Sequence, residues 1–107
     1  MADFLLVETQ GRWSGPGAER LVRDARALAA ARHRVVLLLA GDAVDTVVRP
    51  GPALAGLPLL GAEVWADGFA LEQRALAPGD LPAWITAVDM ARVAEAVLRQ
   101  DSKVVWH

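Results

Sequence analysis

Apolar residues gather in five short runs that are separated by polar, helical or turn-forming segments. Each run is nearly all apolar, and runs without regular polar alternation are typical of strands covered on both faces of a parallel sheet. Gly, Pro and Asp residues lie at several of the run ends and mark turns. The predicted strands are residues 4–7, 35–40, 62–66, 84–88 and 103–106.

Between these runs, the apolar positions change to the spacing of a helix. Leu21, Ala25, Leu28 and Ala29 fall on one helical face, while most of the nearby arginines fall elsewhere. Asp89 is a good N-cap for the last helical segment, in which apolar residues again form a stripe. The predicted helices are residues 18–32, 69–76 and 90–100, with one or two helical turns at 43–48.

Strands that alternate with helices in this way predict an α/β fold of three layers, with a five-stranded and mostly parallel sheet. The length of 107 residues fits one domain, so residues 1–107 are expected to form a single domain. A composition of 54% hydrophobic and 22% charged residues excludes intrinsic disorder, which requires low hydrophobicity and high net charge.

Several classes of function are excluded by the composition. The sequence has no cysteine, which rules out disulfides, thiolate catalysis by this chain and cysteine-ligated zinc. The longest purely apolar run, residues 35–40, is far shorter than a membrane helix, and Asp3 interrupts any signal-peptide pattern, so a cytoplasmic location is expected. The net charge of −2 gives no general attraction to nucleic acids or acidic membranes, and neither is expected as a partner.

In an open parallel sheet, ligands bind beyond the carboxyl ends of the strands. The residues that follow the predicted strands are therefore the candidates for a binding pocket, and most of them are acidic or turn-forming. They are Glu8, Thr9 and Gln10 after the first strand, Gly41 and Asp42 after the second, Asp67 and Gly68 after the third, and Asp89 after the fourth.

Neither a catalytic group nor a metal site is predicted from this set. His33 lies at the end of the first predicted helix, where a cation suits the helix dipole, and a structural role is expected. His107 is the last residue of the sequence and is expected to be mobile. With no histidine recognised at a strand end and no cysteine, no nucleophile–base pair and no dense cluster of metal ligands can be assembled.

Asp67 has two interpretations. Its carboxylate can be a working group in a pocket, or it can cap the following helix by accepting a backbone N–H bond, and the cap is favoured. Asp89 is likewise interpreted as a cap. Asp42 follows Gly41, and its side chain can serve mainly to shape that turn.

The four tryptophans divide into two pairs. Trp65 and Trp106 fall inside predicted strands, where core or subunit packing explains them. Trp13 and Trp84 lie near loops, and exposed tryptophan is a typical anchor of protein interfaces. These two are therefore the predicted interface residues.

Three segments, taken in order, resemble the DsrE/DsrF/DsrH-like family of sulfur-relay proteins, which includes the TusB and TusD types. The segments are ARHRVVLLLAGDAV, GAEVWADGFALEQRAL and ITAVDMARVAEAVLRQDSKVVW, and the likeness covers nearly the whole chain. The last segment is most similar to the DsrH/TusB branch, in which a valine–aspartate pair opens the last helix and the final strand carries tryptophan. The resemblance implies a small flavodoxin-like domain that assembles as an oligomer, often with other subunits of the family.

Active members of this family carry persulfide sulfur on a cysteine just after the third strand, in a pattern of Cys-Gly, a short helix and Arg-Gly. The resemblance places Gly68 and Arg74 on this pattern, whereas Ala75 replaces the second glycine and Asp67 occupies the cysteine position. Sulfur transfer requires thiolate attack and an S–S intermediate, so an aspartate cannot carry the persulfide. The resemblance to the TusB-type branch implies the role of a partner subunit, which fits a chain without thiols.

These observations lead to two hypotheses. The first is a non-catalytic, oligomeric DsrE-like subunit in sulfur transfer or a related pathway, which contacts copies of itself or other DsrE-family subunits. The alternative is a small-molecule-binding protein or enzyme with an acidic pocket at the carboxyl ends of the strands, lined by Glu8, Gln10, Asp42 and Asp67. No cofactor is expected, because flavin or nucleotide binding would rest on fold analogy alone.

Overall fold

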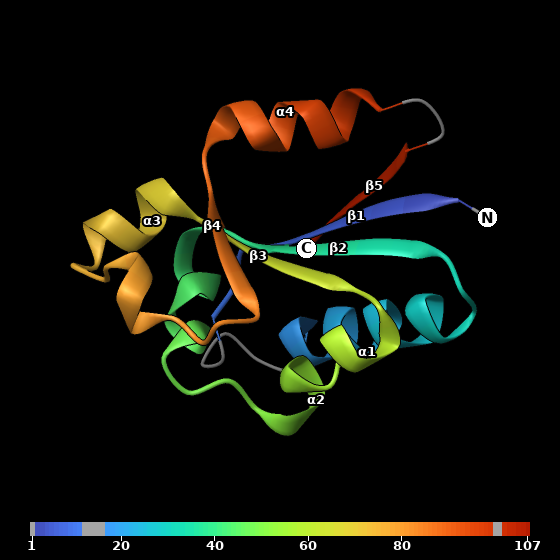
Figure 1. Ribbon diagram of the computed structural model, residues 1–107, viewed down its shortest axis with the longest axis horizontal. Coiled ribbons are helices and arrows are strands. Elements are labelled where there is room, and N and C mark those ends of the chain that lie inside the picture. The colour runs from blue at the N-terminus through green and yellow to red at the C-terminus, as the bar shows by residue number, and fades with distance from the viewer. Residues whose placement is uncertain (1, 12–16, 100–101) are drawn as a thin grey trace.

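Five parallel strands form one sheet, in the order β4-β3-β2-β1-β5 (Figure 1). The computed structural model describes residues 2–11, 17–99 and 102–107. The strands are β1 (Asp3–Glu8), β2 (Arg34–Leu39), β3 (Glu63–Asp67), β4 (Ile85–Val88) and β5 (Ser102–Trp106). Every pair of neighbouring strands is parallel, so the predicted α/β fold with its five-stranded sheet is confirmed.

The sheet has a buried core on each face, because successive side chains of a strand point to opposite sides. On one face, the register aligns Leu6 with Leu37, Leu37 with Val64, and Val64 with Ile85. These four belong to the larger core. The other face has a smaller core built on Leu5, Val7, Leu38, Trp65 and Val88.

Helix α1 (Gly17–Ala30) covers the larger core with the apolar face that its periodicity predicts. Leu21, Ala25 and Ala29 are buried there, and Leu28 is partly buried. The chain passes from β1 through β4 in one direction across the sheet, then returns to place β5 beside β1. Right-handed crossovers therefore put the connections before β4 on one face and the last helix, α4 (Met90–Leu98), on the other (Figure 1).

The connection from β2 to β3 contains more helix than predicted. It holds a 3₁₀ helix, η2 (Gly41–Val47), in place of the predicted turns at 43–48, then α2 (Pro52–Ala55) and a 3₁₀ turn, η3 (Pro58–Leu60). Pro52 stands at the first position of α2, where a missing N–H costs nothing, so a residue type that breaks helices in their interior starts one here. Leu54 and Leu57 are buried in the larger core.

The later helices are shorter than predicted. α3 (Gly68–Gln73) ends before Arg74, and Ala75 has a left-handed backbone with φ of 56°. The chain then forms the 3₁₀ turn η4 (Pro78–Asp80) before β4. α4 ends at Leu98, because Arg99 is extended with ψ of 134°. Among the described helices, none is both long and apolar enough to cross a membrane.

Candidate functional site at the carboxyl edge of the sheet

The carboxyl ends of β3 and β4 border the point where the chain changes face. After β3 the chain enters α3, whose Ala70 and Leu71 join the larger core. After β4 it enters α4, whose Val93 and Ala96 pack on the opposite face. Ligand crevices in open parallel sheets form at such a switch point.

Asp67 and Gly68 lie at this switch point. Asp67 is the last residue of β3 and the N-cap of α3, and its Oδ1 accepts a hydrogen bond of 3.1 Å from the N–H of Phe69. A Cβ atom at Gly68 would lie 3.2 Å from the carbonyl oxygen of Val88, so a glycine allows α3 to start close against β4. Asp89 caps α4 in the same way, accepting from the N–H of Arg92 at 2.9 Å.

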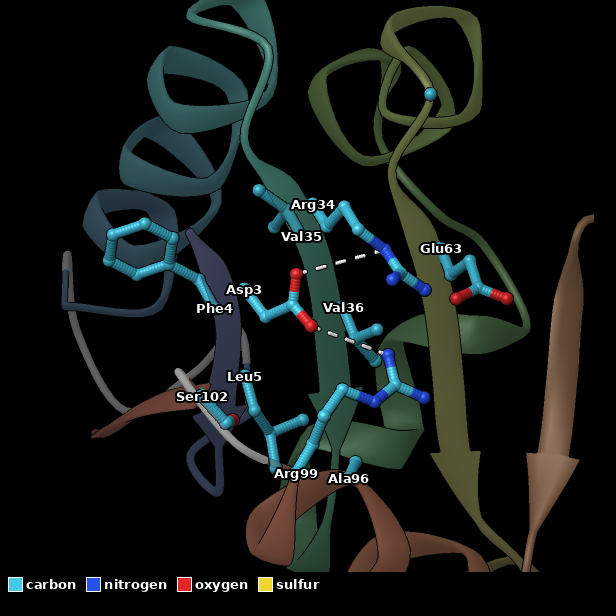
Figure 2. A pocket seen from close by; sticks show the side chains of 11 residues that line it. Asp3, Phe4, Leu5, Arg34, Val35, Val36, Glu63, Ala96, Arg99 and Ser102 are labelled. Atoms are coloured by element: carbon cyan, nitrogen blue, oxygen red, sulfur yellow. Dashed lines mark ion pairs between the residues drawn. The ribbon is translucent and has the colours of Figure 1, made fainter. Parts of the chain in front are cut away.

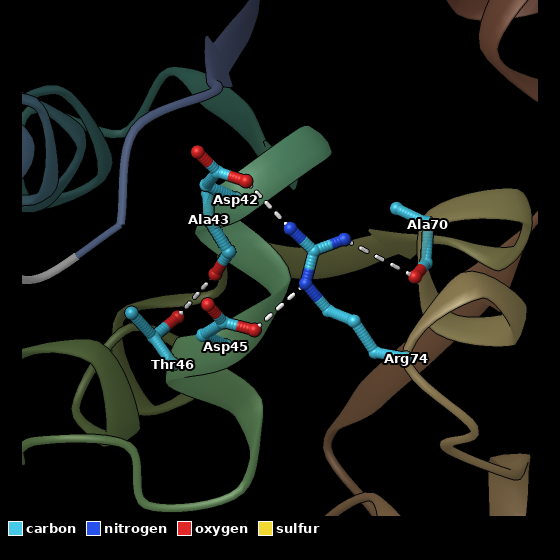
Figure 3. A network of polar contacts seen from close by, with 6 residues as sticks. All are labelled: Asp42, Ala43, Asp45, Thr46, Ala70 and Arg74. Carbon is cyan, nitrogen blue, oxygen red and sulfur yellow. Dashed lines mark hydrogen bonds and ion pairs between the residues drawn. The ribbon is translucent and has the colours of Figure 1, made fainter.

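Arg74 binds two carboxylates of η2 and joins that segment to α3 (Figure 3). Its Nη2 lies 2.6 Å from Asp42 Oδ1, its Nε lies 2.8 Å from Asp45 Oδ1, and its Nη1 donates to the carbonyl of Ala70 at 3.4 Å. Asp42 and Arg74, two of the predicted site residues, are thus in direct contact. Asp45 was not predicted, although its spacing of three residues from Asp42 matches one turn of a 3₁₀ helix.

Glu8 and His107 form a second polar cluster, at the ends of β1 and β5. The carboxylate of Glu8 is only 2% exposed; its Oε2 lies 2.7 Å from Nδ1 of His107, and its Oε1 accepts from the N–H of Gln10 at 2.9 Å. A buried carboxylate needs such partners, since desolvation disfavours an unpaired charge. Because Nδ1 faces Glu8, the imidazole is oriented with Nε2 on its other side.

The expectation that His107 is mobile and that no histidine stands at a strand end is therefore wrong. The N–H of His107 donates to the carbonyl of Val7 at 2.8 Å, and its carbonyl accepts from the N–H of Thr9 at 2.9 Å, which extends the pairing of β1 with β5. The side chain of Thr9 donates to the same carbonyl at 2.8 Å. One signal was available: residue 107 directly follows the last predicted strand, and in a parallel sheet that position lies at the carboxyl edge.

The predicted site residues thus fall into three local groups along one edge. Glu8 and Gln10 lie near His107. Gly41 precedes Asp42, which pairs with Arg74. Asp67 and Gly68 lie beside β4. Backbone fills the edge between the ends of β1 and β2. A Cβ at Gly11 would lie 3.0 Å from the carbonyl of Asp42, and Gly41 adopts a left-handed φ of 53° next to Thr9.

Two hollows in the described part of the chain lie away from this edge. One, of about 70 Å³, lies at the amino ends of β1 and β2 (Figure 2). There Asp3 faces Arg34 Nε at 3.8 Å and Arg99 Nη1 at 3.5 Å, and Glu63 also lines the hollow. The other is an apolar groove of about 270 Å³ between α1 and β5, on the side of the larger core. Sequence reasoning missed the first because the rule for parallel sheets points to the opposite edge, and the second because it depends on the placement of β5 beside β1.

The histidine and tryptophan predictions can also be placed on the fold. His33 accepts from the N–H of Ala2 at 3.2 Å and packs edge-on against Phe4, which is a structural arrangement. Trp84 is partly buried against the larger core, and Trp13 lies outside the described residues. Trp106, the aromatic residue of β5, is 67% exposed. Among the residues that the structure describes, no group of three or more His, Asp or Glu side chains is placed to hold a metal ion.

Comparison with known proteins finds similarity in structure alone. No protein-family model matches the sequence, and no curated protein matches it either. The ychN protein from E. coli superposes with a TM-score of 0.87 at 18% identity, over 100% of both chains. The protein MTH1491 from Methanobacterium thermoautotrophicum has a TM-score of 0.77 at 12% identity, over 98% of this chain and 97% of its own.

A third solved structure, BT1422 from Bacteroides thetaiotaomicron, has a TM-score of 0.77 at 14% identity, over 99% of this chain and 95% of its own. Both MTH1491 and BT1422 are described as proteins of unknown function. At these identities, the likeness shows the fold and not the activity. The chain has a DsrE-like fold, in agreement with the fold that the sequence resemblance implies.

Proposed function

We propose that the chain is a DsrE-type subunit that acts through contact with other chains of the same fold and carries no sulfur itself. The support is a DsrE-like fold over the full chain together with a sequence that contains no cysteine. The pathway, sulfur transfer or a related one, is inferred from the resemblance to the sulfur-relay family. A cytoplasmic location belongs to the same proposal.

Asp67 is the observation that carries this proposal. It occupies the position at the end of β3 where the family resemblance places the persulfide cysteine, and its carboxylate caps α3. A carboxylate cannot form the S–S bond that sulfur transfer requires. The local structure of the loading position is therefore kept while its sulfur chemistry is absent.

Exposed apolar side chains beside this position support a role in association. Phe69 follows the capped start of α3, Met90 follows that of α4, and both are 65% exposed. Large apolar groups exposed at a surface are typical of sites that another protein covers. An oligomer, either of this chain or with related subunits, follows as a proposal.

The test is to mix the purified chain with DsrE-type chains that do carry the cysteine, and to measure the masses of the complexes by native mass spectrometry. A defined complex that contains this chain is the expected result, and its loss in Phe69→Glu would place the contact near Asp67. Glu72→Gln, an exposed change on the same helix, is the control. A chain that stays monomeric, both alone and with every such partner, would overturn the proposal.

The alternative, a small-molecule binder with an acidic site, has one observation in its favour. The carboxylate of Glu8 is buried at the carboxyl edge and orients the ring of His107, an arrangement that proteins also use to position a proton acceptor. A thermal-shift screen with metabolites and metal ions tests it. A ligand whose stabilising effect is lost in Asp67→Ala or Glu8→Gln would favour this function over the first.

A further inference from the structure

Helix α4 is apolar around most of its circumference. Val93 and Ala96 are buried against the sheet, but Met90 is 65% exposed and Leu98 is 83% exposed. A helix that is apolar all round is normally buried on all sides. Figure 1 shows that no other element of the described chain lies on the outer side of α4.

The exposed apolar residues of α4 form one continuous sector. Successive residues turn by about 100° around a helix, which places Ala94 at the centre of this sector. The sector consists of Met90, Ala91, Ala94, Val97 and Leu98, all of them exposed. We call it the outer face of α4.

The charged residues of α4 point elsewhere. Arg92 lies over the ring of Trp65 in β3, with 5.1 Å from its guanidinium carbon to the ring centroid, and it pairs with Glu95 at 3.1 Å. This contact turns the polar side of the helix toward β3. Consequently, the outer face looks toward solvent, while α4 also contacts β5.

β5 adds an exposed aromatic side chain on the same face of the sheet. Trp106 aligns with Val7, whose side chain lies in the smaller core, so Trp106 points to the same face of the sheet as α4. It is 67% exposed at the carboxyl end of the strand. Val104, on the same face of β5, is partly buried against the smaller core. Tryptophan is enriched among the residues that dominate interface energies.

We propose that the outer face of α4, together with Trp106, is the interface between two copies of this chain, related by a twofold axis that passes near Ala94. This inference rests on the proposed function, since it names the surface through which the subunit associates. A twofold interface uses the same patch on both copies, so the patch must be complementary to itself.

The sizes of the side chains meet that requirement. Two antiparallel copies of α4 that cross at Ala94 place Met90 opposite Leu98 of the second copy and Ala91 opposite its Val97. The small Ala94 lies opposite itself and lets the helix axes approach closely, while each alanine on the flank leaves room for a valine. The small residues at the centre and on the flank therefore leave space in which Met90 and Leu98 can pack closely at the two ends of the contact.

The charges agree with the same arrangement. Asp89 stands at the start of α4 and Arg99 directly after its end, so the antiparallel crossing brings oppositely charged helix ends level with each other. Arg92 and Arg99 are already paired within the chain, with Glu95 and Asp3. The surface thus offers apolar contact without free positive charge, which suits a second copy better than a nucleic acid or an acidic peptide.

The required area explains the inclusion of Trp106. A stable dimer buries about 800 Å² on each partner, which is about one eighth of the 6323 Å² surface of this chain. α4 has 9 residues and is therefore only about 13 Å long, too short to supply that area alone. The contact must extend along its flank to β5, where Trp106 is exposed.

Because the sequence has no cysteine, a single introduced cysteine can be used to test the interface by disulfide crosslinking. In the variant Ala94→Cys, the two introduced thiols would face each other across the axis and form a disulfide under mild copper-phenanthroline oxidation. The control is Leu59→Cys, at a residue that is 89% exposed on η3, which lies against α1 on the opposite face. We expect a covalent dimer from the first variant in non-reducing gels and monomer from the second.

A second pair of variants measures the association without a crosslink. Ala94→Glu and Leu59→Glu are compared with the wild-type chain by analytical ultracentrifugation, with circular dichroism to verify that each is folded. We expect the wild-type chain and Leu59→Glu to be dimers and Ala94→Glu to dissociate at least tenfold more readily.

The outcomes separate this inference from the proposed function. A dimer that survives Ala94→Glu and does not crosslink through residue 94 would overturn the α4 interface and leave the subunit role intact. A wild-type chain that is monomeric alone but enters a complex with cysteine-bearing chains would overturn the pairing of identical copies only. A chain that is monomeric under both conditions would overturn both.

Discussion

At the scale of single residues, two carboxylates at the carboxyl edge have different roles. Asp67 is partly exposed and accepts one backbone hydrogen bond at the start of α3. Glu8 is buried and holds an imidazole and a backbone N–H. The first therefore has a local effect on one helix, whereas the second joins the two ends of the described chain.

The cap at Asp67 predicts a specific stability pattern. Asp67→Ala should lower the free energy of unfolding by about 1 kcal/mol, because the N–H of Phe69 loses its acceptor, while Asp67→Asn should remain close to the wild type. Urea denaturation monitored by tryptophan fluorescence measures both. Equal losses in the two variants would show that the charge of Asp67 matters and not its capping bond.

The pair of Glu8 and His107 predicts energetic coupling between residues 99 positions apart. His107→Ala should destabilise the fold by about 3 kcal/mol, because it leaves a buried carboxylate without its main partner. The double variant Glu8→Leu/His107→Ala should lose clearly less, since no buried charge remains. Additive losses in a double-mutant cycle would contradict a direct interaction.

At the scale of elements, the start of α3 lies close against the end of β4. Gly68 follows the cap, and the carbonyl of Val88 occupies the space that a side chain would need. Arg74 then ties the end of the same helix to η2 through two carboxylates that are largely exposed, so each ion pair adds little stability and the network mainly sets geometry.

Replacing Gly68 tests this closeness. Gly68→Ala should lower the free energy of unfolding by about 1 kcal/mol, because its Cβ would lie 3.2 Å from the carbonyl oxygen of Val88 and would push α3 away from β4. Gly79→Ala is the matched control, since a Cβ there meets nothing within 4 Å. Thermal denaturation of the two variants should separate them, and identical midpoints would argue against a tight contact.

At the scale of the whole molecule, the proposed function depends on Asp67, which stands where the family resemblance places the sulfur-carrying cysteine. Asp67 ends β3, a buried strand between β2 and β4, and caps a helix at the switch point of the sheet. The surrounding scaffold should therefore accept a thiol. This expectation belongs to the entire domain, because it depends on the relative placement of β3, α3 and β4.

The variant Asp67→Cys should take up sulfur from inorganic polysulfide. The thiolate attacks an S–S bond of the polysulfide, forms a protein persulfide and releases a shortened polysulfide chain. The N–H of Phe69, which now binds Asp67, can donate to the persulfide anion. Intact-protein mass spectrometry should show faster gain of one sulfur atom than in Asp80→Cys, an exposed control on η4, and equal rates would contradict a preserved loading position.

The elements were largely predictable because their signals are local. The apolar period of α1, the acid that caps each of α3 and α4, and the buried character of β2 can all be read from neighbouring residues. Helix lengths were predicted less well and the helix at Pro52 was not predicted, because small free-energy differences at helix ends depend on packing. Asp42 was predicted from its position after a strand and Arg74 from the family resemblance, but their contact was not predicted, and Asp45 was missed.

By itself, the sequence determined the parallel α/β class, the caps at Asp67 and Asp89, and the absence of any thiol, since these follow from residue type and short-range periodicity. Only the tertiary structure decided that β5 lies beside β1, that His107 therefore meets Glu8, and that one side of α4 is left uncovered. Strand order and the cover of a helix are set by contacts between distant segments, and no local pattern encodes them.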